Sequence, residues 1–373
     1  MTTSLYIHIP FCIKKCVYCD FYSIPFSLEN AGAYTEALCR EIALREGMAK
    51  DLRTIYIGGG TPTLLPEDEM VRILEKVEAV FSVYPDAEIT IEANPGTVSE
   101  KKLLHLRSAG INRISIGVQS LDDRELKLLG RCHTSQHAVD AVRAARKAGF
   151  DTISLDLIYG IPGQTLATWK RTLTHALSCA PEHLSTYELT PERETPLWER
   201  IRRHETVLPS DDEIAEMYYE GLELLKRHGY LHYEISNLAL PGLACKHNMN
   251  YWKRGDYLGI GAAAHSFFEG KRIANISNAE RYIEELNRSS IPVGEETLLS
   301  VEDALKEHIF LGLRMTEGLD LRLLNGAARI RDSKAVGELI RHGLLELDGQ
   351  YLRLTLQGLV LSSEVMVRLL EGL

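Results

Sequence analysis

The chain has 373 residues, 45% hydrophobic and 25% charged, which is the balance of a packed globular protein with one large and one smaller domain. Its formal net charge of −10 argues against an extended phosphate-binding face, so we expect no nucleic-acid partner. No apolar run approaches the roughly 18 residues of a membrane span and no secretion signal begins the chain, so we expect a cytoplasmic protein, with peripheral membrane contact still open.

Short runs rich in Ile, Leu, Val and Tyr alternate with longer segments whose apolar residues recur at spacings of three and four. We predict strands at 5–9, 54–57, 89–92, 113–117, 152–157 and 184–188. We predict helices between them at 34–45, 70–81, 102–106, 138–148 and 166–177. The strands carry almost no charge before their ends, which is typical of parallel strands covered on both faces. Six βα units predict an α/β fold with a partial barrel, because a closed one takes eight.

The pattern turns helical in the last part of the chain. We therefore predict a first domain at 1–290 and a second at 291–373. Within the second we expect helices at 301–313 and 333–342, a hairpin joining 344–347 to 351–354, and a final helix. This order resembles a small winged-helix module, and a helical cap on the first domain is the alternative.

Three of the seven cysteines stand within eight positions, directly after the first predicted strand: Cys12, Cys16 and Cys19. An odd, crowded set favours a metal site in a reducing compartment over a disulfide scaffold. A C-x3-C-x2-C loop at a strand end can wrap three thiolates around one inorganic core and leave a further position open. Zinc, with His8 or His247 as fourth ligand, is the alternative.

Polar and glycine-rich groups also follow the other predicted strands. They are Gly58-Gly59-Gly60-Thr61-Pro62 after the second strand, Glu92 at the end of the third, Gln119 after the fourth, Arg131 in LLGRCHT and Asp156 at the end of the fifth. Any one of them could be a capping or surface residue. Together they would form a ring on the rim that bears the cysteines, which predicts a pocket for a polar, charged cofactor.

The cysteine spacing, with the aromatic Tyr18 before the last cysteine, resembles the signature of the radical S-adenosylmethionine (SAM) superfamily. The resemblance implies a [4Fe–4S] cluster on Cys12, Cys16 and Cys19, whose open iron takes the amino and carboxylate groups of SAM. It also implies an electron donor for the cluster as a partner.

Six motifs in order sharpen the resemblance: LYIHIPFC, IGGGTPT, IEANP, SIGVQS, LLGR and DLIYGIPGQT. They are similar to the branch that contains oxygen-independent coproporphyrinogen III oxidase (HemN) and the HemW-type haem chaperones. The resemblance implies a partial (β/α)6 radical SAM barrel with a smaller C-terminal helical or winged-helix-like domain. It also implies SAM contacts at Tyr6, Tyr18, Gly59, Gly60, Thr61, Glu92, Gln119, Arg131 and Asp156.

Two departures speak against the oxidase. Phe21 stands where the oxidase pattern has a further cysteine, and Cys12 follows almost at once on the start of the chain, without the oxidase's N-terminal segment. We therefore expect no coproporphyrinogen oxidase activity.

The segment Cys245-Lys246-His247-Asn248-Met249-Asn250-Tyr251-Trp252 resembles the HNxxYW motif of HemW-type chaperones. His247 and Cys245 are of the two commonest axial-ligand types, with His247 favoured, and Tyr251 and Trp252 offer flat faces to a porphyrin. A packed aromatic loop with a hydrogen-bonded histidine is the alternative.

The haem propionates would need a basic group, for which Lys246, Lys253 and Arg254 are the nearest candidates in sequence. The resemblance implies a carrier within porphyrin metabolism rather than an enzyme, with haem as cargo and haem-accepting proteins, expected to be respiratory, as partners. A HemN-like oxidase or another radical SAM enzyme acting on a tetrapyrrole is the alternative.

Overall fold

One large mixed sheet organises the chain. The structure is a computed structural model that describes residues 2–324 and 326–372. In these residues the sheet has twelve strands, in the order β14-β13-β12-β11-β1-β4-β5-β6-β7-β8-β10-β9. The six predicted strands pair in parallel, each with the next: β1 (Thr2–Ile9), β4 (Lys50–Gly59), β5 (Val83–Ala93), β6 (Arg113–Gln119), β7 (Thr152–Tyr159) and β8 (His183–Glu188). All six extend beyond their predicted bounds, because backbone pairing continues past the apolar run.

The sheet stays open, as a partial barrel should. Next to β8 lie two short antiparallel strands, β10 (Asn237–Ala239) and β9 (Leu231–Glu234). On the other side β1 pairs in parallel with β11 (Tyr257–Ile260), which continues into antiparallel β12 (His265–Phe268), β13 (Lys271–Asn275) and β14 (Val293–Leu298). A separate pair, β2 (Phe11–Cys12) and β3 (Ile24–Pro25), carries the first of the three neighbouring cysteines. The six-unit α/β core predicted from the sequence is confirmed.

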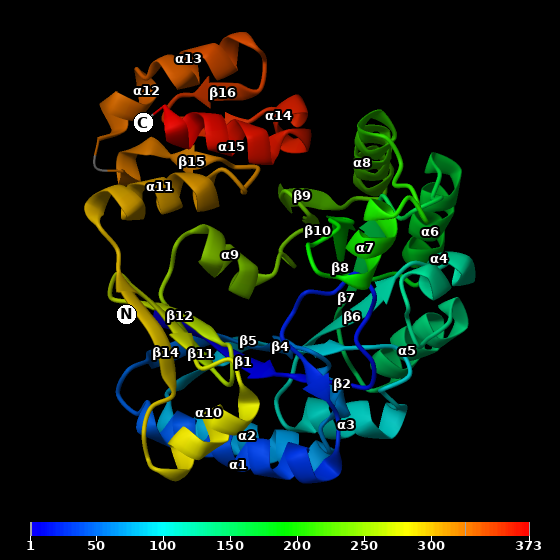
Figure 1. Cartoon of the computed structure of the whole chain (residues 1–373), viewed down its shortest axis with the longest axis vertical. Coiled ribbons are helices and arrows are strands. Elements are labelled where there is room, and N and C mark those ends of the chain that lie inside the picture. Colours follow the sequence, from blue (N-terminus) through cyan, green and yellow to red (C-terminus); the bar gives the residue numbers. More distant parts are fainter. Residues whose placement is uncertain (1, 325, 373) are drawn as a thin grey trace.

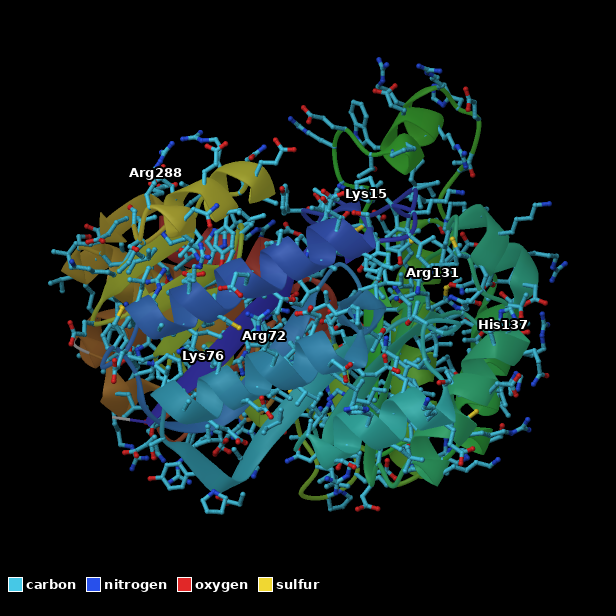
Figure 2. The ribbon with its side chains drawn as sticks, turned by 90° about the horizontal axis from the view of Figure 1, so that it is seen from below. Lys15, Arg72, Lys76, Arg131, His137 and Arg288 are labelled. Carbon is cyan, nitrogen blue, oxygen red and sulfur yellow. The ribbon has the colours of Figure 1, made fainter. Side chains whose placement is uncertain are left out.

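Helices cover the outer face of the parallel strands. The crossover helices are α1 (Leu28–Leu44), α2 (Glu67–Val80), α3 (Glu100–Ser108), α5 (Ser135–Lys147) and α6 (Leu166–Ser178), with α4 (Asp123–Leu128), α7 (Pro196–Arg202), α8 (Asp211–Arg227) and α10 (Ala279–Asn287) beside them. A 3-10 turn, η1 (Pro62–Leu64), follows β4. Figure 2 shows α1, α2, α3 and α5 side by side in one layer. Helix α1 begins six residues before its predicted start at Tyr34, because the Ser27 side chain accepts the N–H of Asn30 as an N-cap.

The two faces of the parallel strands differ in chemistry, which corrects the expectation of apolar strands on both sides. In β6, Ile114, Ile116 and Val118 are buried in the hydrophobic core, whereas Arg113 and Ser115 line an interior cavity. Side chains of a strand alternate between faces, so the same division holds along its neighbours. The inner face of the sheet is therefore a wall of hydrogen-bonding groups, and the helix-covered face alone is apolar.

The C-terminal part has its own small sheet, which favours a separate module over a helical cap. Its elements are α11 (Val301–Gly312), β15 (Leu319–Asp320), η2 (Leu321–Leu323), α12 (Ala327–Arg331), α13 (Lys334–Arg341), β16 (Leu345–Asp348), β17 (Tyr351–Leu354), α14 (Leu356–Val360) and α15 (Ser362–Glu371). The three strands are antiparallel, and Figure 1 shows the module as the orange-to-red lobe. Strand β14, which lies within the predicted second domain at 291–373, pairs with β13 in the large sheet.

None of the helices that the structure describes combines the length and the apolar character needed to cross a bilayer.

Candidate functional site

A cavity of about 430 Å³ opens at the carboxyl ends of the parallel strands and follows the inner face of the sheet. Its volume suits a small-molecule site. The three cysteines line it, together with eight of the nine residues predicted to contact SAM, namely Tyr18, Gly59, Gly60, Thr61, Glu92, Gln119, Arg131 and Asp156. The ninth, Tyr6, lies outside the lining and stacks on Tyr56, which is part of it. The fold thus brings together residues spread over more than a hundred positions.

The cysteine loop forms one end of the cavity. Cys12 ends β2, and its Sγ lies 3.9 Å from Oγ1 of Thr61, two residues after the end of β4. Cys16 and Cys19 follow in a tight turn, in which the Cys19 N–H donates to the Cys16 carbonyl at 3.3 Å. All three thiols are partly exposed and belong to the same cavity wall. The donor set therefore fits an iron–sulfur cluster with an open position.

Positive charge surrounds these thiols. Arg131 Nη1 donates to Cys16 Sγ at 3.5 Å, and Lys14 and Lys15 line the cavity from the cysteine loop itself. Figure 2 labels Lys15 and Arg131. Cationic neighbours favour thiolate over thiol and offset the negative charge of a cluster.

The zinc alternative loses its proposed fourth ligand in this arrangement. His8 bonds through Nδ1 to the Tyr6 hydroxyl at 2.9 Å and through Nε2 to the Tyr22 carbonyl at 3.3 Å. Neither His8 nor His247 lines the cavity.

Glu92 is the central carboxylate of the cavity. Its two oxygens accept the Tyr56 hydroxyl at 2.8 Å and the Gly59 N–H at 3.0 Å. Burial raises the pKa of Glu92 to about 7, and the nearby Asp156 carboxylate adds to the rise. A small change in its surroundings, such as a bound cation, would therefore decide its charge near neutral pH.

Gly59 and Gly60 are required because neighbouring residues approach their Cα atoms too closely for a side chain. Gly59 has φ +117°, and a Cβ there would lie 2.6 Å from the His8 ring. A Cβ on Gly60 would lie 2.6 Å from the Phe11 carbonyl oxygen, at the entry to the cysteine loop. Its N–H donates to the Ile9 carbonyl at 2.8 Å. In this structure the glycine run therefore positions the cysteine loop and Glu92, and its amides are engaged within the protein.

Asp156 and Gln119 complete the ring from β7 and β6. Asp156 accepts the hydroxyl of Ser185 at 2.7 Å and that of Ser115 at 3.0 Å, and burial raises its pKa. Gln119 has φ +65°, a conformation that costs free energy in a residue with a Cβ and that is concentrated at functional sites. Gln119 is part of the cavity lining.

Asn94 is a residue of the rim that the sequence did not lead us to predict. Asn94 donates from Nδ2 to Thr61 Oγ1 at 2.7 Å and accepts from Arg131 Nη2, which also donates to the Gly117 carbonyl at 2.7 Å. Asn94 thus joins two residues predicted to contact SAM. Its place in IEANP, two positions after Glu92, was the available signal, because residues two apart on a strand share a face.

The segment Cys245–Trp252 lies at the opposite, amino-end side of the same strands. Helix α9 (Lys246–Trp252) has Cys245 as its N-cap residue, and Cys245 and Asn248 line the cavity. Glu88, near the middle of β5, accepts the N–H groups of Lys246 at 3.1 Å and His247 at 3.0 Å. The Cys245 thiol donates to the same carboxylate at 3.5 Å, and burial raises the pKa of Cys245 to about 12.

His247 is buried, with both ring nitrogens engaged. Nδ1 lies 2.7 Å from Thr54 Oγ1, and Nε2 lies 2.8 Å from the Tyr251 hydroxyl. Thr54 donates its own proton to Ser4 Oγ, so the network assigns the His247 proton to Nδ1 and leaves the Nε2 lone pair accepting from Tyr251. Burial lowers the pKa of His247 to about 3, so the ring is neutral at pH 7. In this structure the segment is therefore packed around a hydrogen-bonded histidine, which was the alternative to an open haem ligand.

Trp252 contacts the C-terminal module. The Arg314 guanidinium lies 4.4 Å from the centre of the Trp252 ring, a cation–π contact. Figure 1 shows α9 between the C-terminal lobe and the strands of the large sheet, and α9 touches both α11 and β4. Of the four residues predicted to contact haem, Cys245 lines the cavity, whereas His247, Tyr251 and Trp252 are not part of its lining.

Known proteins share this arrangement. The Radical SAM superfamily model matches residues 6–176, and the HemN C-terminal domain model matches residues 299–361. The haem chaperone HemW of Bacillus subtilis is 36% identical over 369 residues, which cover 97% of each chain. That of Escherichia coli is 44% identical over 267 residues, which cover 70% of this chain and 69% of that protein. The chain belongs to the HemW family.

A solved structure extends the likeness beyond this family. The coproporphyrinogen III oxidase HemN of Escherichia coli has a TM-score of 0.87 and 25% sequence identity, and the match covers 100% of this chain and 90% of that one. A protein of the HemW family thus shares both the radical SAM core and the C-terminal module with HemN.

Proposed function

We propose that this protein binds haem and transfers it to haem-accepting proteins, with respiratory haemoproteins as the expected acceptors, in the cytoplasm and within porphyrin metabolism. The names of its relatives support a haem carrier. The observation that best supports this proposal is that one side chain, Tyr56, contacts both the HNxxYW-like helix and the cofactor cavity. The Tyr56 ring stacks on His247, with ring centres 5.1 Å apart, and its hydroxyl donates to Glu92. The HNxxYW-like helix and the cofactor cavity are therefore two sides of one structure.

The cavity would hold the cofactors of the superfamily. Cys12, Cys16 and Cys19 would bind a [4Fe–4S] cluster, and the residues of the rim, Tyr18, Gly59, Gly60, Thr61, Glu92, Gln119, Arg131 and Asp156, would bind SAM with Tyr6 behind them. The chemistry that a bound cluster would supply is one-electron reduction of SAM, with the electron coming from an external donor. The ionised form of Glu92 would attract a cationic ligand, and the positive charge of Arg131 at Cys16 would offset an anionic cluster.

Haem would take His247 as its axial ligand, with Cys245 as the second candidate. A neutral imidazole needs no deprotonation, whereas the Cys245 thiol is held protonated against Glu88. Because the Nε2 lone pair accepts from Tyr251, iron binding requires that hydrogen bond to open. A ligand that must first be released from a partner suits a carrier, which has to give its cargo up again.

Haem titration followed by absorbance tests the assignment. The variants are His247→Ala, Cys245→Ala and their double mutant, and His137→Ala on the outer helix α5 is the matched control. We expect His247→Ala to weaken binding strongly, Cys245→Ala to weaken it less and His137→Ala to leave it unchanged. Parent-like binding by the double mutant would remove the segment from the haem site.

The competing function is a HemN-like oxidase, which the fold likeness to HemN favours. Phe21, at the place of the oxidase's further cysteine, is 67% exposed at the cavity mouth and offers no ligand. We expect no decarboxylated product from coproporphyrinogen III in an anaerobic assay with SAM and a reductant. Formation of that product would establish the oxidase in place of the carrier.

A further inference from the structure

Arg113 is a buried cation at the inner end of the cavity. It is the first residue of β6 and lies four positions before Gly117, whose carbonyl accepts a hydrogen bond from Arg131. At about 3.3 Å per residue, its Cα lies about 13 Å from the rim that carries the cysteine loop. Its side chain is 3% exposed and lines the cavity. It therefore stands below the residues predicted to contact SAM, on the side of α9.

The guanidinium of Arg113 is short of partners. Its Nε and Nη1 are buried and have no hydrogen-bond acceptor among the residues that the structure describes. A buried charge without hydrogen bonds is costly, since removal from water is then uncompensated. Such a group inside a cavity indicates a ligand that supplies the missing acceptors.

The neighbouring polar groups already have other hydrogen-bond partners. The carboxyl groups of Glu88 and Asp156 lie within electrostatic range of Arg113. The oxygens of Glu88 already accept from the Cys245 thiol and from the N–H groups that begin α9, and those of Asp156 accept from Ser185 and Ser115. His183 bonds through Nδ1 to Ser154 Oγ and through Nε2 to the Tyr233 hydroxyl, both at 2.7 Å. Burial and the charge of Arg113 lower its pKa, so His183 is neutral beside the cation.

We propose that Arg113 binds a carboxylate of the cargo, a propionate side chain of the tetrapyrrole. This inference rests on the proposed haem function. A guanidinium is always charged and its planar donors match a carboxylate. Cys245 and Asn248 of the HNxxYW-like segment line the same part of the cavity, so a tetrapyrrole held by α9 has Arg113 within its surroundings. SAM also carries a carboxylate, but the cysteine loop that would receive it lies at the other end.

The basic residues that are close in sequence are less suitable. Lys246 and Lys253 are exposed, and Arg254 donates to Glu307 at 2.7 Å and stacks on Phe267. Arg113, from a strand more than 130 positions earlier in the chain, has Nε and Nη1 without acceptors among the described residues. Arg131 Nε is also without an acceptor there, but its other donors are bound to Cys16 and Gly117 at the cysteine end of the cavity.

The first test needs no haem. Thermal unfolding of the parent, Arg113→Gln and Arg113→Lys is measured in sodium propionate and in sodium chloride at equal ionic strength. A ligand that binds only the folded state raises the melting temperature. We expect propionate to raise it above the chloride value in the parent and in Arg113→Lys, but not in Arg113→Gln. Equal propionate shifts in the parent and Arg113→Gln would overturn the carboxylate site, whether or not the protein carries haem.

The second test identifies the carboxylate. The parent, Arg113→Gln and the control Lys246→Gln are titrated with haem, with haem dimethyl ester and with SAM. We expect the parent and the control to bind haem at least about tenfold more tightly than its ester, and Arg113→Gln to bind both alike, with SAM affinity unchanged. Loss of SAM affinity alone in Arg113→Gln would assign the site to the methionine carboxylate and overturn the propionate. Failure of the parent to bind haem would refute the proposed function and leave the propionate melting test to decide the carboxylate site.

Discussion

Removal of one hydroxyl should make His247 a better ligand. The Tyr251→Phe substitution keeps the aromatic ring of the segment and deletes the group that donates to His247 Nε2 at 2.8 Å. Nδ1 keeps its bond to Thr54, so the tautomer with its lone pair on Nε2 is retained. If haem iron binds this lone pair, the parent must break the Tyr251 bond first and the variant need not.

The size of the effect follows from the worth of that bond. A typical intramolecular hydrogen bond contributes about 0.5–1.5 kcal/mol net. Because about 1.4 kcal/mol corresponds to a tenfold change in affinity, haem should bind Tyr251→Phe about two- to twelvefold more tightly. The free energy of unfolding should fall by a similar amount, since the bond is intact in the folded protein without haem.

Haem titration and urea unfolding of the same samples measure both quantities. Tyr257→Phe is the matched control: its ring packs 4.6 Å from that of Tyr251, but its hydroxyl accepts from Arg272. Tyr257→Phe should leave the haem affinity at the parent value. Unchanged or weaker haem binding in Tyr251→Phe, in a protein that folds like the parent, would show that Nε2 is not the iron ligand.

Three further outcomes follow from the cavity. Cys16→Ser, purified anaerobically, should lose the cluster, and full iron and sulfide content in it would exclude Cys16 as a ligand. Gly60→Val should lose both cluster and SAM binding, because a Cβ there would lie 2.6 Å from the Phe11 carbonyl oxygen. Such overpacking costs about 1–3 kcal/mol of stability. An iron content equal to that of the parent would contradict this expectation. Glu92 titrates near pH 7, and a carboxylate attracts cationic SAM better than a carboxyl does, so SAM affinity should fall as pH drops from 8 to 6. Glu92→Gln should bind SAM weakly with little pH dependence, and a profile that matches the parent would assign the titration to another group.

Much of the cavity could be predicted from local patterns. Cys12, Cys16 and Cys19 are adjacent in sequence, and the other rim residues follow apolar runs that are recognisable as strands. Parallel strands place all their carboxyl ends on one edge, so a strand pattern with polar ends already implies a ring of polar groups. This geometry explains why eight of the nine residues predicted to contact SAM line one cavity.

The haem segment shows where local patterns stop. The sequence shows a histidine between a cysteine and two aromatic residues, which suits an open ligand and a packed histidine equally well. His247 is a packed histidine because it is hydrogen-bonded to Thr54 and Glu88, which lie more than 150 positions away from it in the chain. No spacing within the segment contains that information, because the partners are brought to it by the pairing of β4 and β5.

The sequence by itself determined the α/β core, the cysteine loop and the polar rim, because these depend on residue type, on spacing and on the shared direction of parallel strands. Only the tertiary structure decided that His247 is buried with both nitrogens bonded, that Lys246 and Lys253 face solvent, and that Arg113 keeps free donors inside the cavity. Hydrogen-bond satisfaction and burial are properties of groups that meet through the fold. They are settled by which distant segments pack together, and the order of residues along the chain leaves them open.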